Sequence, residues 1–345
     1  MYYIFINFTN SLNVTYMKKI IFAIALSSLL FGCSKDTFND NYSYNVNRAA
    51  GALYEYLIAP SATNSNITTY NNNHYVCVDT RTTLKNKLFV FFPGTTGSPE
   101  FYKLIVKKAA SLGYHAIGLM YPNGYDMYTT SAASSDSTQF GKCRQEIFDG
   151  TNQTTGVNVD VNNCIKNRLY KLLVYLNQQY PALNYGQFIN GDTVRWSKCS
   201  LAGHSQGGGH AFYIAKKVGV ERAISFASID WNTYYGKSAP WVKQSGITPI
   251  SKFYSINSTK DEVFSYSNVQ TQLADMGLTG NAVSIDNNSS PYSSTHKLTT
   301  SATPAIAFVA WPNHNITCID QYVPKDRQGA VASSFANAWT YLISY

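Results

Sequence analysis

Residues 198–217 contain the feature that most constrains the fold, because two regular segments are joined there by a turn rich in glycine. Residues 198–202 have the apolar character of a short strand, and residues 210–217 have the pattern of a helix. Between them stands Gly203-His204-Ser205-Gln206-Gly207, a Gly-x-Ser-x-Gly pattern. Glycine on both sides of a serine lets neighbouring backbone pass without a Cβ clash. The pattern predicts a strand, a sharp turn and a helix, with the Ser205 hydroxyl held clear of the sheet.

Short apolar runs alternate with amphipathic stretches from about residue 86, which indicates a mostly parallel sheet with helices on both faces. The predicted strands are residues 88–92, 115–120, 198–202, 222–227, 252–256 and 305–311, and the remaining predicted helices are residues 100–111, 164–180 and 330–343. Residues 122–162 are long and polar, so we expect a lid or a substrate-binding excursion there. With 345 residues and 45% hydrophobic composition, the chain suits one large catalytic domain, expected over residues 48–345.

With these elements in this order and the serine turn in the middle, residues from about 50 to 345 resemble an α/β-hydrolase. The stretch from Cys143 through Ser205 also resembles a bacterial family of secreted serine hydrolases. The residues that carry this second resemblance are Asn167-Arg168-Leu169, Tyr180-Pro181, Arg195-Trp196 and Gly203-His204-Ser205-Gln206-Gly207-Gly208. The resemblance implies an α/β-hydrolase fold with an inserted lid-like loop and a Ser-His-Asp triad. It implies no substrate.

In this fold the catalytic residues follow the chain order serine, acid, histidine. Ser205 is therefore the expected nucleophile, and beyond its own turn only His296 and His314 follow it. His314 comes directly after the last predicted strand, where the resemblance places the base, so we prefer it to His296. A surface or packing role remains the alternative for either histidine.

The acid is expected just past the strand that ends at Ile256. Asp261 lies there and is our choice, and the adjacent Glu262 is expected to point elsewhere. Asp230, which follows the preceding strand, is the rival, because some α/β-hydrolases carry their acid at that position. Either carboxylate could instead cap a loop by accepting hydrogen bonds from local backbone N–H groups.

An ester attacked by Ser205 develops an oxyanion that needs preorganised donors. The backbone N–H of Gln206, at the start of the helix, is one expected donor. The second is expected from the loop after residue 92, Pro93-Gly94-Thr95-Thr96-Gly97, where Thr95 is preferred and Thr96 stays open. The alternative for this loop is a simple tight turn that requires glycine.

Aromatic residues gather after residue 227, and they could line an acyl pocket or serve ordinary packing. They are Trp231, Tyr234, Tyr235 and Trp241. His204 and His210, on either side of the serine, are expected to be structural. No metal cluster, phosphate-binding loop or carboxylate pair stands out, so we predict an enzyme without cofactor or metal.

The N-terminus reads as an export signal. Met17-Lys18-Lys19 is a basic segment, residues 20–31 are apolar, and Leu30-Phe31-Gly32-Cys33 resembles the lipobox of bacterial lipoproteins. The apolar run is too short to span a membrane. The resemblance implies a start at Met17, removal of residues 1–32, lipidation of Cys33 and a polar tether at residues 34–47. An ordinary secretory signal is the alternative.

Besides Cys33 the chain has five cysteines, an odd number, so at least one is expected to stay free. Cys143 and Cys164 flank a polar loop, and a disulfide between them is expected to stabilise the fold by roughly 3 kcal/mol. Cys199, inside the strand before Ser205, is expected to be a small buried core residue. The pairing of Cys77, Cys199 and Cys318 is left open.

The chain has 27 basic and 19 acidic residues, a formal net charge of +8, which becomes +6 without Lys18 and Lys19. No run of five basic residues occurs, so we expect a mildly basic surface and no nucleic-acid partner. The expected partners are an ester substrate and, through the lipid anchor, the bacterial cell envelope.

The resemblance implies a serine hydrolase that cleaves a carboxylic ester through an acyl-enzyme intermediate. Acyl transfer to an alcohol or sugar would use the same residues. A non-catalytic binding lipoprotein could keep the fold and lack the chemistry. Fold analogy does not choose among ester substrates.

Overall fold

The structure, a computed structural model, describes residues 51–345. The predicted signal segment at residues 1–33, its lipidated Cys33 and the tether at residues 34–47 lie outside the described residues. Within residues 51–345, no helix combines the length and the apolar composition needed to cross a membrane.

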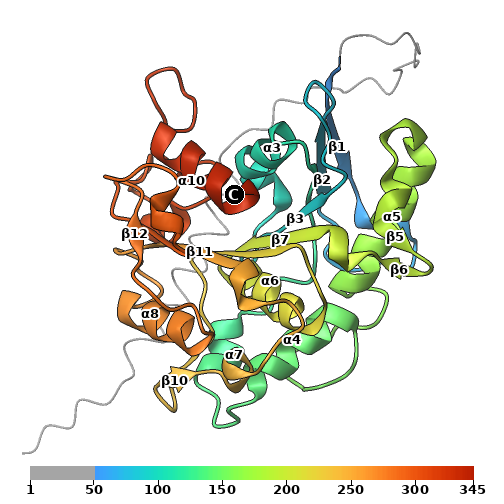
Figure 1. Ribbon diagram of the computed structural model, residues 1–345. Helices are drawn as coiled ribbons and strands as arrows, with labels where there is room; N and C mark the ends of the chain where they lie inside the picture. Colours follow the sequence, from blue (N-terminus) through green and yellow to red (C-terminus); the bar gives the residue numbers. More distant parts are fainter. Residues whose placement is uncertain (1–50) are drawn as a thin grey trace, which may run out of the picture. The chain divides into compact units, whose positions relative to one another are not determined.

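A nine-stranded sheet runs through residues 51–345 in the order β1-β2-β4-β3-β7-β8-β11-β13-β12 (Figure 1). The strands are β1 (Leu53–Ile58), β2 (His74–Asp79), β3 (Leu88–Phe92), β4 (His115–Gly118), β7 (Cys199–His204), β8 (Arg222–Phe226), β11 (Phe253–Ser258), β12 (Val283–Ser284) and β13 (Lys297–Thr300). Strands β1, β2 and β4 pair antiparallel, and every other pair in this sheet is parallel. Two small hairpins, β5 (Ile189–Asn190) with β6 (Thr193–Val194) and β9 (Trp231–Asn232) with β10 (Lys237–Ser238), lie outside it.

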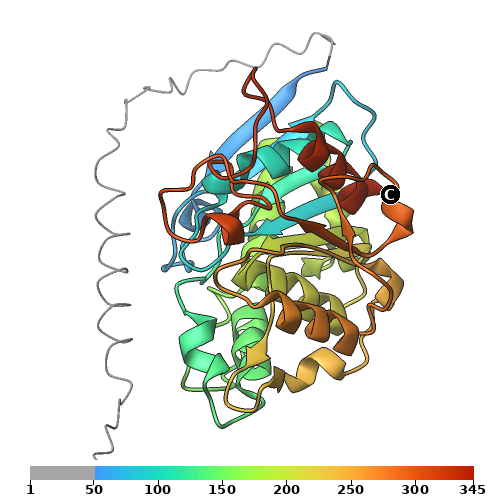
Figure 2. The same ribbon diagram turned by 90° about the vertical axis from the view of Figure 1, so that its left-hand side faces the viewer.

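Helices cover both faces of the sheet, because successive side chains of each buried strand point to opposite faces. On β3, Phe89 and Phe91 pack with α3 (Lys103–Ser111) and α10 (Ser333–Ser344). Leu88, Val90 and Phe92 pack in the other core, which contains α4 (Gln139–Asp149), α5 (Ile165–Gln179), α6 (Gln206–Lys217), α7 (Pro240–Lys243) and α8 (Tyr266–Asp275). Figures 1 and 2 show α3 and α10 on one side of the sheet and α4, α6 and α8 on the other.

The parallel register brings the carboxyl ends of the central strands to one edge. Phe92 of β3 pairs with Gly203 of β7, His204 pairs with Phe226 of β8, and Phe226 pairs with Ile256 of β11. The loops that follow these strands therefore meet, which is where open α/β sheets carry their ligand sites. The strand order, the mostly parallel pairing and the covering helices form the α/β-hydrolase fold predicted from the sequence.

The predicted last strand, residues 305–311, is wrong. The strand that pairs with β11 is β13, with Ser255 opposite Lys297. Residues 305–311 lie between Pro304 and Pro312 and form no strand, and the side chain of Phe308 is fully exposed. Their apolar character resembles a buried strand, but within residues 51–345 no strand of a sheet pairs with them.

The polar stretch at residues 122–162 is a folded insertion with helical segments of its own. It contains a π-helical turn, η2 (Tyr128–Ala132), and the helix α4. Helix α4 buries Phe140, Ile147 and Phe148 in the core that contains α5 and α6. The insertion is therefore anchored to the sheet domain by α4.

Candidate active site

Ser205 occupies the predicted sharp turn between β7 and α6. Its backbone has φ 51° and ψ −120°, a strained conformation for a residue with a Cβ. The Ser205 N–H donates to the Phe226 carbonyl at 2.9 Å, which fixes the turn to β8. A Cβ on Gly207 would lie 2.1 Å from the Phe92 oxygen, and a Cβ on Gly203 would lie 2.3 Å from the Gly207 carbonyl carbon. Both flanking glycines are therefore required by close backbone contact, and Ser205 is left partly exposed at the sheet edge.

His314 and Asp261 are hydrogen bonded to each other, although 53 residues separate them. His314 lies in the short helix α9 (Pro312–Asn315), and Asp261 lies in the loop after β11. The distance from His314 Nδ1 to Asp261 Oδ2 is 2.9 Å, and the two side chains are only 5% and 2% exposed. The structure thus brings together the histidine and the acid that were preferred on the sequence.

The environment of Asp261 favours its charged form. Its Oδ1 accepts backbone N–H groups from Val263 at 2.8 Å and Phe264 at 2.9 Å. Burial raises the pKa of the carboxyl, but the His314 imidazole and these N–H groups outweigh burial and hold the pKa below its ordinary value. A carboxylate therefore faces Nδ1, which assigns the proton of a neutral His314 to Nδ1 and leaves Nε2 as the acceptor.

Glu262 holds the backbone of the His314 turn, and the expectation that it points elsewhere is wrong. Its Oε2 accepts the His314 N–H at 2.9 Å, and its Oε1 accepts the Asn313 N–H at 3.1 Å and the Asn313 amide at 2.6 Å. The His314 ring packs between His204 and Phe264, with centroid distances of 4.8 and 5.2 Å. Two adjacent acidic residues thus bind one histidine: Asp261 binds the His314 ring, and Glu262 binds its backbone N–H.

Within residues 51–345, neither Ser205 Oγ nor His314 Nε2 makes a hydrogen bond, so the two are not bonded to each other. Such contacts are often long in enzymes without substrate and tighten when substrate binds. Ser205 directly follows His204, whose ring touches that of His314. The serine and the imidazole accordingly occupy the same edge of the sheet.

The rival histidine lies elsewhere. His296 Nδ1 contacts the Phe253 carbonyl at 2.8 Å, and its ring stacks on Tyr254 at 4.3 Å. Phe253 begins β11, so His296 sits at the amino ends of the parallel strands. That edge is opposite to the one that carries Ser205.

The rival acid, Asp230, belongs to a buried ion pair that the sequence did not reveal. Arg144 of α4 donates to both Asp230 oxygens, at 2.5 and 2.6 Å, and both side chains are 1% exposed. Trp241 Nε1 donates to the same carboxylate at 2.9 Å. The remaining Arg144 nitrogen donates to the Gln206 carbonyl at 2.9 Å, so this pair also supports the start of α6. A single arginine in a polar stretch carries no sequence signal of such a role.

Two backbone amides near Ser205 are free to bind an anion. Within residues 51–345, the N–H groups of Thr95 and Gln206 have no acceptor, whereas the Thr96 N–H donates to the Asn123 carbonyl at 3.0 Å. The Thr95 hydroxyl also donates to the Gln206 side-chain oxygen at 2.8 Å. The geometry therefore leaves Thr95, rather than Thr96, available as the second donor.

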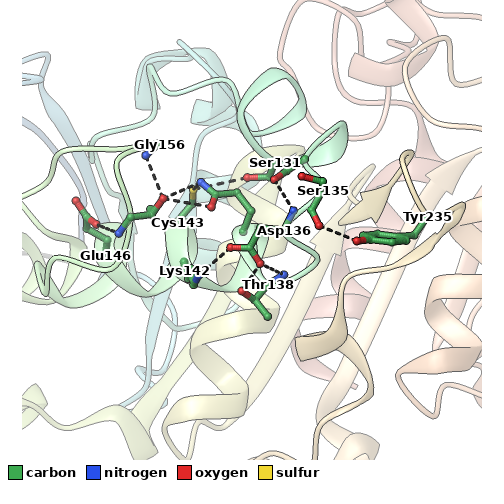
Figure 3. Close-up of polar contacts among 12 residues, drawn as sticks. Ser131, Ser135, Asp136, Thr138, Lys142, Cys143, Glu146, Gly156 and Tyr235 are labelled. Carbon is green, nitrogen blue, oxygen red and sulfur yellow. Dashed lines mark hydrogen bonds and ion pairs between the residues drawn. The ribbon is translucent and has the colours of Figure 1, made fainter.

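The insertion at residues 122–162 is held by its own polar contacts (Figure 3). Asp136 accepts from Thr138 and from Lys142, the latter at 2.7 Å. Tyr235, on the β9–β10 hairpin, donates to the Ser135 carbonyl at 2.7 Å. Of the four aromatic residues after residue 227, Trp241 is buried against Asp230, whereas Tyr234 and Tyr235 are 64% and 44% exposed.

The predicted disulfide between Cys143 and Cys164 is not formed. All five cysteines within residues 51–345 are free and buried, including Cys199, which is a core residue as expected. Cys164 Sγ accepts the Asn167 N–H at the start of α5, and Cys143 Sγ accepts from Ser131 and Gln139 inside the insertion. Each thiol thus has local partners on its own segment. No group of three or more His, Cys, Asp or Glu residues suited to a metal occurs in the described part of the chain.

No protein-family model and no curated protein matches the chain. Three solved structures illustrate its structural likeness. A Klebsiella pneumoniae protein assigned as a dienelactone hydrolase has 12% identity and a TM-score of 0.44, over 85% of this chain and 100% of its own. A dienelactone hydrolase-like promiscuous phosphotriesterase from metagenomic libraries has 12% identity and a TM-score of 0.39, over 85% and 99%. An alpha-beta serine hydrolase homologue from Coxiella burnetii has 13% identity and a TM-score of 0.35, over 75% and 90%. The fold assignment itself stands on the strand order and register described above.

Proposed function

We propose that the protein is a serine hydrolase that cleaves a carboxylic ester. The observation that carries the proposal is the 2.9 Å contact between His314 Nδ1 and Asp261, on the same sheet edge as the strained Ser205 turn. A nucleophile, a base and a group that orients the base are the three parts that nucleophilic catalysis at serine requires.

In the proposed reaction, Ser205 Oγ attacks the ester carbonyl while His314 Nε2 accepts the hydroxyl proton. Asp261 keeps the His314 proton on Nδ1 and stabilises the imidazolium that forms. The imidazolium then gives its proton to the leaving alkoxide, which departs as an alcohol. Water, deprotonated by the same Nε2, attacks the acyl-enzyme, releases the carboxylic acid and restores Ser205.

The free N–H groups of Thr95 and Gln206 support the same proposal. Both lie beside Ser205 and have no acceptor within residues 51–345. They are the proposed donors to the tetrahedral oxyanion, where loss of one donor typically costs about 10²–10³ in kcat. Because Gln206 begins the 12-residue helix α6, the helix dipole adds favourable field.

Covalent labelling tests the proposal directly. We expect a fluorophosphonate probe to modify Ser205 of the wild type, as read by peptide mass, and p-nitrophenyl esters to be turned over. Ser205→Ala should lose the label and at least about 10³-fold in turnover. Ser200→Ala, on the same strand and buried, is the matched control and should keep both. A wild type that neither labels nor turns over any ester of a panel of acyl chain lengths and aryl esters would exclude the proposal.

The same residues would serve acyl transfer, and product analysis separates the two reactions. With added alcohol at rising concentration, a hydrolase yields carboxylic acid throughout. A transferase yields the new ester in proportion to the alcohol.

We also propose that the protein is exported and anchored by lipid at Cys33, on the basis of the lipobox-like sequence Leu30-Phe31-Gly32-Cys33. Metabolic labelling with an alkyne fatty acid in a bacterial host should mark the wild type in the membrane fraction. Cys33→Ser should carry no label, and an equally labelled variant would contradict the anchor.

A further inference from the structure

A buried chain of hydrogen bonds runs beneath Ser205 and links three separate segments. The Gly94 N–H contacts the Tyr102 hydroxyl at 3.1 Å, and this hydroxyl contacts His204 Nδ1 at 3.1 Å. His204 Nε2 contacts the His314 carbonyl at 3.2 Å. Tyr102, His204 and His314 are 1%, 2% and 4% exposed. Tyr102 ends the turn η1 (Pro99–Tyr102), and His204 ends β7.

The chemistry of the partner atoms decides which is the donor and which the acceptor in each of these hydrogen bonds. A backbone carbonyl only accepts, so His204 Nε2 must carry a proton. Burial, together with the neighbouring His314 imidazole, lowers the pKa of His204 to about 3, so the ring is neutral and its Nδ1 must accept. Tyr102 therefore donates its proton to Nδ1, and its oxygen accepts the Gly94 N–H. Each ring nitrogen of His204 therefore makes one hydrogen bond. Nε2 must be the donor and Nδ1 the acceptor, and the two roles cannot be swapped.

We infer that Tyr102 and His204 are positioning residues, which hold the Gly94–Thr95 loop and the His314 turn in register with Ser205. This inference rests on the proposed function. His204 directly precedes the proposed nucleophile, Ser205, and binds the backbone carbonyl of His314. Asp261 binds the ring of His314, and Glu262 binds its backbone N–H. Small misplacements of reacting groups lower the reaction rate more than the substrate affinity. Loss of a hydrogen bond in this series should therefore lower kcat.

Two substitutions of His204 each remove one of its two hydrogen bonds and keep the other. In His204→Gln the side-chain NH₂ can replace Nε2 and still donate to the His314 carbonyl, whereas the Tyr102 proton loses its acceptor. In His204→Asn the side-chain oxygen can replace Nδ1 and still accept from Tyr102, but the His314 carbonyl loses its donor. We expect His204→Asn to lower kcat by about 10–100-fold with KM changed less than about threefold, and His204→Gln to stay within about fivefold of the wild-type kcat.

Tyr102→Phe tests the other end of the chain, because it leaves the Gly94 N–H and His204 Nδ1 without partners. It should lower kcat about tenfold or more in the wild type and by a somewhat smaller factor in His204→Gln, where the bond to His204 is already lost and only the Gly94 contact is left to remove. His115 supplies the matched control, since it is also buried and contacts a backbone carbonyl, that of Leu183, at 2.8 Å, but lies at the start of β4. His115→Asn and His115→Gln should leave kcat unchanged.

The downfield imidazole N–H proton of His314 gives a readout that needs no turnover. It should be absent in Asp261→Asn, shifted or broadened in His204→Asn, and unchanged in His204→Gln and His115→Asn. Wild-type kcat and an unshifted resonance in a folded, probe-labelled His204→Asn would overturn the inference. An unlabelled wild-type Ser205 would instead overturn the proposed function, so the two failures are distinguishable.

Discussion

His314 is the residue whose position depends on the most separate contacts. Asp261 holds its ring nitrogen Nδ1, Glu262 holds its backbone N–H, and His204 holds its backbone carbonyl. Each partner satisfies a different polar group, so the imidazole has one remaining nitrogen, Nε2. That nitrogen is the one the proposed reaction requires.

Asp261→Asn should therefore inactivate the enzyme without unfolding it. The amide can donate to Nδ1, which would move the proton of His314 to Nε2 and remove the base. We expect kcat for p-nitrophenyl esters to fall by about 10³–10⁴-fold at pH 7. Asp286→Asn is the matched control, because Asp286 also accepts hydrogen bonds after a sheet strand, from Thr300 and Ser301, and touches no histidine. Comparable losses in both variants would contradict the assignment.

At this scale, much of the candidate site could be predicted from local patterns. The Ser205 turn depends on glycines within two residues of it, which the sequence displays directly. The choice of Asp261 and His314 depended on chain order, and their 2.9 Å contact agrees with it, while their catalytic roles stay predictions. Glu262 and Arg144 could not be assigned, because their partners are 51 and 86 residues away.

At the level of elements, the Arg144–Asp230 pair ties the inserted helix α4 to the turn that begins α6. The guanidinium binds the carboxylate through two hydrogen bonds and the Gln206 carbonyl through a third. A Cβ on Gly209 would lie 1.9 Å from Arg144 Nη2, so α6 must present glycine where the arginine crosses it. The insertion thus supports the backbone of a proposed oxyanion donor.

Removing one partner of the Arg144–Asp230 pair should lower the stability of the fold, because the other charge is then left buried without a partner. We expect Arg144→Met to lower the free energy of unfolding by about 3–5 kcal/mol, as measured by urea titration. Lys142→Met is the matched control on the same helix. Its pair with Asp136 is about 40% exposed and should contribute about 0–1 kcal/mol. Equal effects of the two variants would show that the buried pair is not what anchors α4.

The last strands of the sheet show why element prediction failed where it did. Residues 305–311 contain only apolar side chains, yet they are largely exposed, whereas β13 has the sequence Lys-Leu-Thr-Thr and is buried. Pairing with β11 and β12 buries β13, and only the tertiary arrangement decides which segment receives those partners.

At the scale of the whole molecule, buried histidines set how stability depends on pH. Burial lowers the pKa of His74, His115, His204 and His210, to about 3 for His74 and His204. In the unfolded chain histidine titrates near 6.5. Below that pH the unfolded state binds more protons than the folded state. The contribution of these histidines to the free energy of unfolding is therefore fully present above pH 6.5 and decreases as the pH falls toward 3.

Urea titrations at several pH values test this expectation. His74 and His204 should each contribute a slope on the order of 1.4 kcal/mol per pH unit below about pH 6.5. Asp320, whose pKa burial raises to about 6, acts in the opposite direction and offsets part of the loss. The free energy of unfolding should fall by at least about 2 kcal/mol between pH 7.5 and pH 5. His204→Gln should have a shallower slope, and a pH-independent wild type would contradict the account.

The sequence by itself determined the strained Ser205 turn, the buried central strands and the chain order of serine, acid and histidine. These features depend on residues that are neighbours along the chain, where glycine content and hydrophobic period act directly. Only the tertiary structure decided that Asp230 pairs with Arg144, that Cys143 and Cys164 form no disulfide, and that β13 rather than residues 305–311 pairs with β11. Such contacts form between segments far apart in sequence, and the packing of whole elements selects among partners that local patterns leave equivalent.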